Sequence, residues 1–205
     1  MNATKTYGRK LSTRIAVFGA LLAAVILSGC ASTGHQDAGT LALDLSMPAP
    51  GKSKVVFIRP KSDVNALHFG VHDGERLIGR SSASTYFVYE CDAGHHVFSS
   101  SFGNVGILNA ELLPDRIYYV KVMGVLQSWG PAWVKMTALY PGGNGIDWAQ
   151  MPNVLAELRK SIVSNDQVEH DRTGIEGYRE RMKKYQSSAE SINPEYGQIA
   201  PLALR

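Results

Sequence analysis

The part of the sequence from Lys54 to Tyr140 repeats short apolar runs rich in Val, Ile, Phe and Tyr, each bounded by Gly, Pro, Asp or Asn. Runs of this length and composition are typical of antiparallel β-strands. Because no run of helical period interrupts them, they favour a sandwich or barrel over a fold in which strands and helices alternate. The eight predicted strands span residues 54–59, 67–73, 75–80, 84–91, 95–102, 106–112, 116–124 and 132–140.

Turn residues predict three of the connections between these strands. Asp73-Gly74 tolerates positive φ and predicts a tight type I′ hairpin between the second and third strands. Asp92-Ala93-Gly94 and Pro114-Asp115 predict two later turns. The fold class that we expect is mainly β: an antiparallel β-sandwich, Ig-like or related, followed by a C-terminal helical segment.

The hydrophobic period changes to that of a helix after the glycine-rich stretch 141–145. Pro152 can begin a helix that runs to about residue 164, and its apolar face consists of Val154, Leu155, Leu158 and Ile162. Thr173 and Glu176 have the spacing of a capping box and predict a second helix. The apolar stripe of this second helix consists of Ile175, Tyr178, Met182 and Tyr185. We expect the stripe to pack on the sheet or on the first helix, with a partner groove as the alternative.

The N-terminus has the order of a bacterial signal peptide, in which a basic region precedes an apolar run and a cleavage site. Four basic residues and no acidic one precede the apolar run at residues 15–27. This run is too short to span a bilayer, because a spanning helix needs ~20 apolar residues. It ends in Leu27-Ser28-Gly29-Cys30, which matches the lipobox of bacterial lipoproteins.

The resemblance to lipoproteins implies cleavage between Gly29 and Cys30, a diacylglycerol thioether on Cys30 and an N-acyl chain such as palmitate. Several acyl chains on one residue give stable attachment to a lipid bilayer. Ala31 stands where Asp would signal retention in the inner membrane of enteric bacteria. We therefore expect the protein in the cell envelope, on the periplasmic face of the outer membrane. The alternatives are an uncleaved helix and a secretory signal with a chance cysteine.

Four segments are expected along the chain: the lipoprotein signal peptide at 1–29, a lipidated tether at 30–52, the β-sandwich domain at 53–141 and a helical extension at 142–205. The tether is rich in Ser, Thr, Gly, Ala and Pro, as flexible linkers are. Removal of residues 1–29 leaves 17 Lys and Arg against 18 Asp and Glu. Because the mature chain is nearly neutral, no nucleic-acid partner is expected.

Four segments carry a resemblance to a known family. They are Val-Val-Phe-Ile-Arg-Pro at 55–60, Val-His-Asp-Gly-Glu-Arg-Leu-Ile-Gly at 71–79, Tyr-Phe-Val-Tyr-Glu at 86–90 with Gly-His-His at 94–96, and Ile-Tyr-Tyr-Val-Lys-Val at 117–122. With them the chain resembles the uncharacterised bacterial lipoproteins grouped as domain of unknown function 2846. It departs from that family at Cys91-Asp92-Ala93, where a proline turn is usual, and at Pro114-Asp115, where glycine is common. The resemblance implies a small β-sandwich on a lipid anchor and brings no catalytic residues.

Histidines His68, His72, His95 and His96 raise the question of a metal site. His68 and His72 share a strand face but lie about 13 Å apart at ~3.3 Å per residue, while His95 and His96 point to opposite faces. A site would need one histidine from each strand and a carboxylate such as Asp92. We therefore predict no metal and no other cofactor, and we expect His95 to hydrogen-bond the neighbouring strand or backbone.

Cys91 ends an apolar alternation, and lipid on Cys30 leaves it without a disulfide partner. We expect it to be a small buried hydrophobic residue. A redox or nucleophilic role, for example with His95 as the base, is the alternative.

Trp129, Trp133 and Trp148 flank the change from strands to helices and are the candidate surface-binding residues. Exposed aromatic side chains stack on sugars or form the hot spots of protein interfaces, although they could instead cover the core where helix meets sheet. With no catalytic constellation in the sequence, we expect a membrane-anchored, non-enzymatic envelope lipoprotein whose β-domain contacts a protein or a glycan. The alternative is a periplasmic hydrolase, directed at the cell wall or dependent on a metal held by the histidines.

Overall fold

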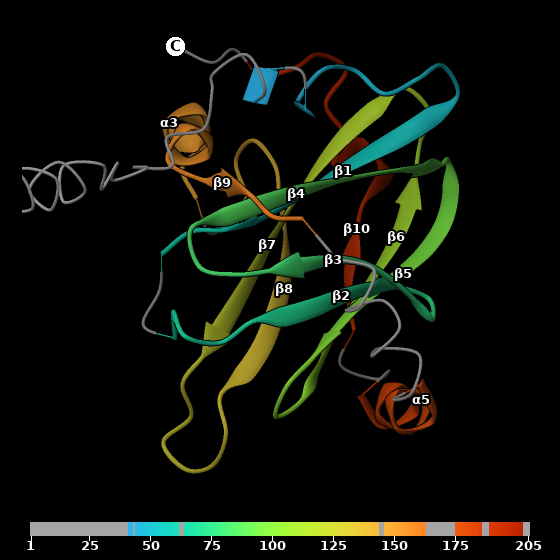
Figure 1. Ribbon diagram of the computed structural model, residues 1–205. Helices are drawn as coiled ribbons and strands as arrows, with labels where there is room; N and C mark the ends of the chain where they lie inside the picture. Colours follow the sequence, from blue (N-terminus) through green and yellow to red (C-terminus); the bar gives the residue numbers. More distant parts are fainter. Residues whose placement is uncertain are drawn as a thin grey trace, which may run out of the picture. The chain divides into compact units, whose positions relative to one another are not determined.

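Two five-stranded sheets pack face to face in the computed structural model, which describes residues 41–42, 44–61, 64–143, 146–162, 175–185 and 189–202 (Figure 1). The first sheet has the order β8 (Trp133–Leu139), β7 (Arg116–Val125), β1 (Lys52–Arg59), β4 (Thr85–Asp92) and β9 (Arg159–Lys160). The second has the order β10 (Glu190–Ile192), β6 (Val105–Leu112), β5 (Gly94–Ser101), β2 (Phe69–Asp73) and β3 (Arg76–Ser81).

The predicted mainly β sandwich is therefore confirmed, and strands β1 to β8 match the eight predicted ranges to within two residues at each end. The pairing is not purely antiparallel, however. Within the described ranges, β1 pairs with β7, β4 with β9 and β6 with β10 in parallel, whereas the other five pairings are antiparallel. The chain crosses from one sheet to the other several times, for example between β1 and β2 and between β4 and β5. Strands that follow each other in sequence therefore often lie in different sheets.

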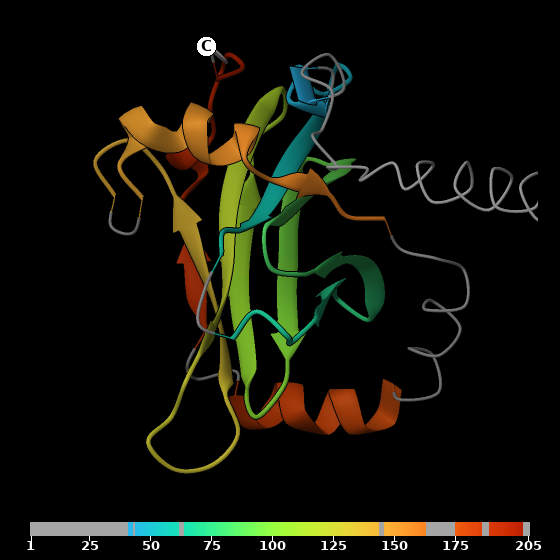
Figure 2. The same cartoon turned by 60° about the vertical axis from the view of Figure 1, so that its left-hand side comes forward.

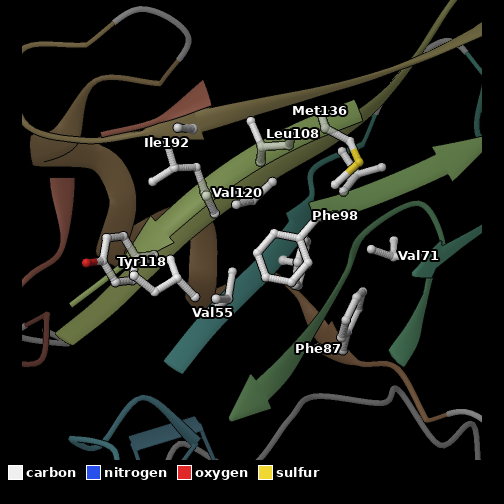
Figure 3. Packing of buried hydrophobic residues seen from close by; sticks show 14 of the residues in the cluster. Val55, Val71, Phe87, Phe98, Leu108, Tyr118, Val120, Met136 and Ile192 are labelled. Atoms are coloured by element: carbon white, nitrogen blue, oxygen red, sulfur yellow. The ribbon is translucent and has the colours of Figure 1, made fainter. Parts of the chain in front are cut away.

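The main core lies between the two sheets. Successive side chains of a strand point to opposite faces, and those that point inward form this core. Phe57 of β1 stacks on Phe87 of β4 with ring centroids 4.8 Å apart and meets Phe98 of β5 edge-on at 5.3 Å. Figure 3 shows the rings of Phe87 and Phe98 among the aliphatic side chains of both sheets. Gly79 of β3 packs directly on the Phe87 ring, because a Cβ placed there would lie 2.2 Å from it.

A second core covers the outer face of the first sheet, which explains why β1 is buried on both faces. Val56 and Ile58 of β1 point outward into this core. They are covered by the short helix α3 (Met151–Ala156), which follows the 3-10 turn η2 (Trp148–Gln150), and by the chain segment that contains Leu41 and Leu45. Pro152 lies in the first turn of α3, as the sequence indicates.

The helix predicted from Pro152 to Ser164 is wrong in its second half, because α3 ends at Ala156 and the chain then adds to the edge of β4. The Arg159 N–H donates to the Ser84 carbonyl at 3.0 Å, and the Ser161 N–H donates to the Tyr86 carbonyl at 2.7 Å. Hydrogen bonding to the backbone at the edge of β4 thus determines the structure of this segment, and not its helical pattern of apolar residues.

The described end of the expected tether 30–52 is not a free linker, because Leu41 and Leu45 are 4% and 1% exposed. From Leu41 onward the chain is packed on the sandwich rather than free as a linker. The expected helical extension 142–205 is likewise not separate, since α3 completes the second core. All described residues belong to one compact unit.

The second predicted helix is confirmed as α5 (Ile175–Tyr185), which packs on the second sheet. Tyr178 of the predicted stripe is buried, with its ring 4.7 Å from that of His72, and its hydroxyl donates to the Gly74 carbonyl at 2.7 Å. Arg179 pairs with Glu75 beside it. Thr173 of the capping box lies outside the described residues. The chain then forms β10 and the 3-10 turn η4 (Pro194–Tyr196).

The Asp73-Gly74 hairpin is present, but it is not the predicted type I′ turn. Asp73 pairs with Arg76, so Gly74 and Glu75 are the two loop residues. Of these only Gly74 has positive φ, at 56°. This is the pattern of a type II′ turn, which needs glycine at the first loop position alone. Asp115, in the turn predicted at Pro114-Asp115, also has positive φ.

The signal peptide, the lipobox and Cys30 lie outside the described residues. In the ranges that are described, no helix is long and apolar enough to cross a membrane.

Candidate functional site

Exposed apolar side chains gather at the end of the sandwich that is formed by the β5–β6 and β7–β8 loops. The two loops are in contact, because the Gly103 N–H donates to the Ala132 carbonyl at 3.3 Å. Seven large hydrophobic side chains are exposed in the described part of the chain, and five of them belong to these loops or to the strand ends beside them. We call these five residues the aromatic end: Phe102, Val125, Leu126, Trp129 and Trp133.

The structure separates the three tryptophans that the sequence singles out. Trp129 is 93% exposed in the β7–β8 loop, and Trp133 is 47% exposed at the start of β8. Trp148 instead packs on the second core, with its ring edge-on to that of Tyr119 at 5.5 Å. Trp129 and Trp133 thus keep their candidate role, whereas the position of Trp148 matches the alternative of core packing.

A groove of about 410 Å³ lies beside the aromatic end, where β8 of the first sheet faces β6 of the second. We call it the edge groove. Its apolar lining includes Val105, Ile107, Val125, Trp133, Met136 and Tyr185. Its polar lining includes Asn104, Gln127, Lys135 and Glu190.

Two polar contacts fix the walls of the edge groove. The Asn104 side chain donates to the Val134 carbonyl at 3.0 Å and accepts from the Val134 N–H at 2.6 Å, which ties the β5–β6 loop to the backbone of β8. Lys135 of β8 forms an ion pair with Glu190 of β10 at 3.1 Å. The first contact joins the β5–β6 loop to β8, and the second joins β8 to β10, so both link the first sheet to the second beside the groove.

Leu126 and Phe102 belong to this region but were not identified from the sequence as binding residues, whereas Tyr185 was named only in the helical stripe whose alternative role was binding in a partner groove. Tyr185 reaches the groove from the C-terminal end of α5, far along the chain from Trp133. A signal was present for the loop, since residues 122–134 contain no charged residue although they include a turn with Gly130-Pro131. A charge-free loop that contains tryptophan is unusual on a solvated surface.

The histidines do not converge. His72 is buried against Tyr178, while His68 and His95 are exposed. In the described part of the chain, no three His, Cys, Asp or Glu side chains lie close enough together to hold one metal ion.

His96, rather than His95, makes the hydrogen bonds that we expected near this turn. Its Nδ1 lies 2.8 Å from Oδ2 of Asp73, and its Nε2 lies 3.0 Å from the Asp92 carbonyl oxygen. The same Asp73 oxygen accepts from the Tyr89 hydroxyl at 3.0 Å. Burial is the main reason that the pKa of Tyr89 is raised, and the negative charge of Asp73 raises it further. This network ties β2 to β4 and β5 where the chain passes between the sheets.

Cys91 is buried at the end of β4, as expected, and its thiol faces the Ser53 carbonyl oxygen at 3.8 Å. Burial raises the pKa of this thiol to about 12, and the charges of Asp73, Asp92 and Glu90 act in the same direction. The thiol is therefore protonated at neutral pH, which disfavours the nucleophilic alternative.

Arg59 lies in one of the segments that carry the family resemblance, and its role in this structure is to stabilise the fold. It is fully buried, lies over the Phe69 ring at 4.4 Å and donates to the carbonyls of Val64 at 2.7 Å and Leu67 at 2.6 Å. Desolvation lowers its pKa. The guanidinium thereby fixes the loop between β1 and β2.

Comparisons of the chain with protein-family models, with curated proteins and with solved structures found no match. The resemblance to domain of unknown function 2846 therefore stays a prediction.

Proposed function

We propose that this chain is an envelope lipoprotein, anchored through acylated Cys30 to the periplasmic face of the outer membrane, whose β-sandwich is a non-enzymatic contact module for an envelope protein or a glycan. The order of basic region, apolar run and lipobox supports the anchor. The edge groove, next to exposed aromatic side chains, supports the contact function.

The edge groove carries the proposal because its lining suits recognition. Trp133 and Tyr185 supply large, rigid aromatic surface, which can stack on a sugar ring or receive an apolar side chain. Gln127 and the Lys135–Glu190 pair at the margin offer hydrogen-bond donors and acceptors to the same ligand. A mostly apolar concave site with a few polar groups is the usual form of a ligand-binding site.

The anchor is tested by growing cells with labelled palmitate and comparing Cys30→Ser with Cys91→Ser. These two substitutions remove the two cysteines of the chain one at a time. We expect Cys30→Ser to lose the label and to leave the membrane fraction, while Cys91→Ser keeps both properties. Label that persists on Cys30→Ser would overturn the anchor.

The contact function is tested by crosslinking in intact cells, followed by affinity purification of the full-length chain. Wild type should capture a defined envelope protein or glycan, and Trp133→Ala should capture much less of it. Equal capture by both chains would show that the edge groove does not mediate the contact.

A further inference from the structure

The aromatic end differs from the rest of the surface in more than its exposed rings. Neither residues 97–110, which include the β5–β6 loop, nor residues 122–134, which include the β7–β8 loop, contain a charged residue. Trp129 and Leu126 are 93% and 63% exposed in the β7–β8 loop, while Phe102 is half-exposed in the β5–β6 loop. An exposed apolar cluster of this kind marks a surface that becomes buried against a partner or a membrane when the protein functions.

Basic side chains lie beside this apolar cluster. Helix α5 occupies the same end of the sandwich as the β7–β8 loop in both views (Figures 1 and 2), and its last residue, Tyr185, shares the edge groove with Gln127 and Trp133. The last turn of α5 carries Lys183 and Lys184, both exposed. The last turn of α5 therefore brings positive charge to the same end of the sandwich as the apolar loops.

We infer that this end of the sandwich docks on an anionic lipid surface, with Trp129, Leu126 and Phe102 in the interfacial layer and Lys183 and Lys184 against the headgroups. Tryptophan favours the boundary between headgroups and acyl chains, because its ring is apolar and its N–H can remain hydrogen-bonded. Lysines within a Debye length of an anionic surface are attracted to it. A neutral glycan would account for the rings but not for the lysines in the last turn of α5.

This inference goes beyond the proposed function, because it involves neither Cys30 nor a ligand in the edge groove. It gives the sandwich a second, reversible membrane contact through its own surface. Binding of this kind scales with the buried apolar area and with the charge of the lipid.

The test is co-sedimentation of the non-acylated chain 31–205, which contains the whole compact unit, with lipid vesicles. Vesicles of phosphatidylethanolamine with phosphatidylglycerol are compared with pure phosphatidylcholine, each at low and at high salt. We expect binding to the anionic vesicles that weakens with salt and is much weaker on phosphatidylcholine.

Matched variants locate the contact. Trp129→Ser and Leu126→Ser should each weaken binding about tenfold, whereas Ile162→Ser and Ile199→Ser, which remove other largely exposed apolar side chains, should leave it unchanged. Joint replacement of Lys183 and Lys184 by Gln should also weaken binding about tenfold and remove most of its salt dependence. These positions are exposed, and circular dichroism confirms the fold of each variant.

Two results would overturn the inference: no binding to anionic vesicles, whether or not the chain self-associates through Trp129, or equal binding by Trp129→Ser and Ile162→Ser. Neither of them bears on palmitate labelling of Cys30 or on capture through Trp133. Failure of the lipid contact is thus distinguishable from failure of the proposed function.

Discussion

Replacement of Leu155 by alanine should destabilise the whole sandwich, although Leu155 lies outside the sheets. Its side chain is fully buried in the second core, between α3 and the outer face of the first sheet. The substitution removes three carbon atoms, and at about 0.8 kcal/mol each the lost transfer free energy is roughly 2.4 kcal/mol. The cavity that is left raises the expected loss in unfolding free energy to about 3–4 kcal/mol.

Urea unfolding measures this loss. For an m-value of about 2 kcal/mol/M, the midpoint of Leu155→Ala should fall by about 1.5–2 M with no change in m. Ile162→Ala is the control, because it removes the same number of carbon atoms from a side chain that is 82% exposed, and it should stay within about 0.5 kcal/mol of wild type. Equal midpoints for the two variants would refute the assignment of α3 to the core.

Gly79 and Cys91 are both buried, and each leads to a test of the packing around it. Gly79→Ala should destabilise the chain by about 1–3 kcal/mol in the same urea assay, because the new Cβ would lie 2.2 Å from the Phe87 ring. Gly177→Ala in α5 should instead be neutral or stabilising by up to about 1 kcal/mol, because the new Cβ would lie 3.5 Å from a side-chain nitrogen of Arg181. A larger loss of stability for Gly177→Ala than for Gly79→Ala would contradict this packing. The Cys91 thiol, whose pKa is raised to about 12, should resist iodoacetamide at pH 8 in the folded chain and react once urea unfolds it, as read by mass spectrometry. Alkylation at equal rates in both states would show that the thiol is accessible.

The strands could be predicted from the sequence, because each alternation of apolar and polar residues reports the pleat of its own strand. Their pairing could not. The parallel contact of β1 with β7 joins residues such as Val55 and Tyr118, and no local pattern specifies that choice. For the same reason β9 was assigned to a helix, since Leu158 and Ile162 continue the helical period while the edge of β4 determines the outcome.

The candidate site was predictable only in part. Trp129 and Trp133 were candidates because they flank the change from strands to helices and because tryptophan side chains often form binding surfaces. Trp148 could not be told apart from them, because its burial depends on Tyr119 in another strand. The edge groove was not foreseen, since it forms only when the end of α5 reaches β8.

The central claim, that the sandwich contacts an envelope partner through the edge groove, is tested most directly by a photocrosslinker placed in the anchored chain in living cells. Benzoylphenylalanine at Tyr185, which lines the groove, is compared with the same residue at Tyr140, which stacks on Tyr196 outside the groove lining. We expect a crosslinked protein or glycan of defined mass from position 185 that is absent from position 140 and lost with Trp133→Ala. The same products from both positions, or none from position 185, would contradict it.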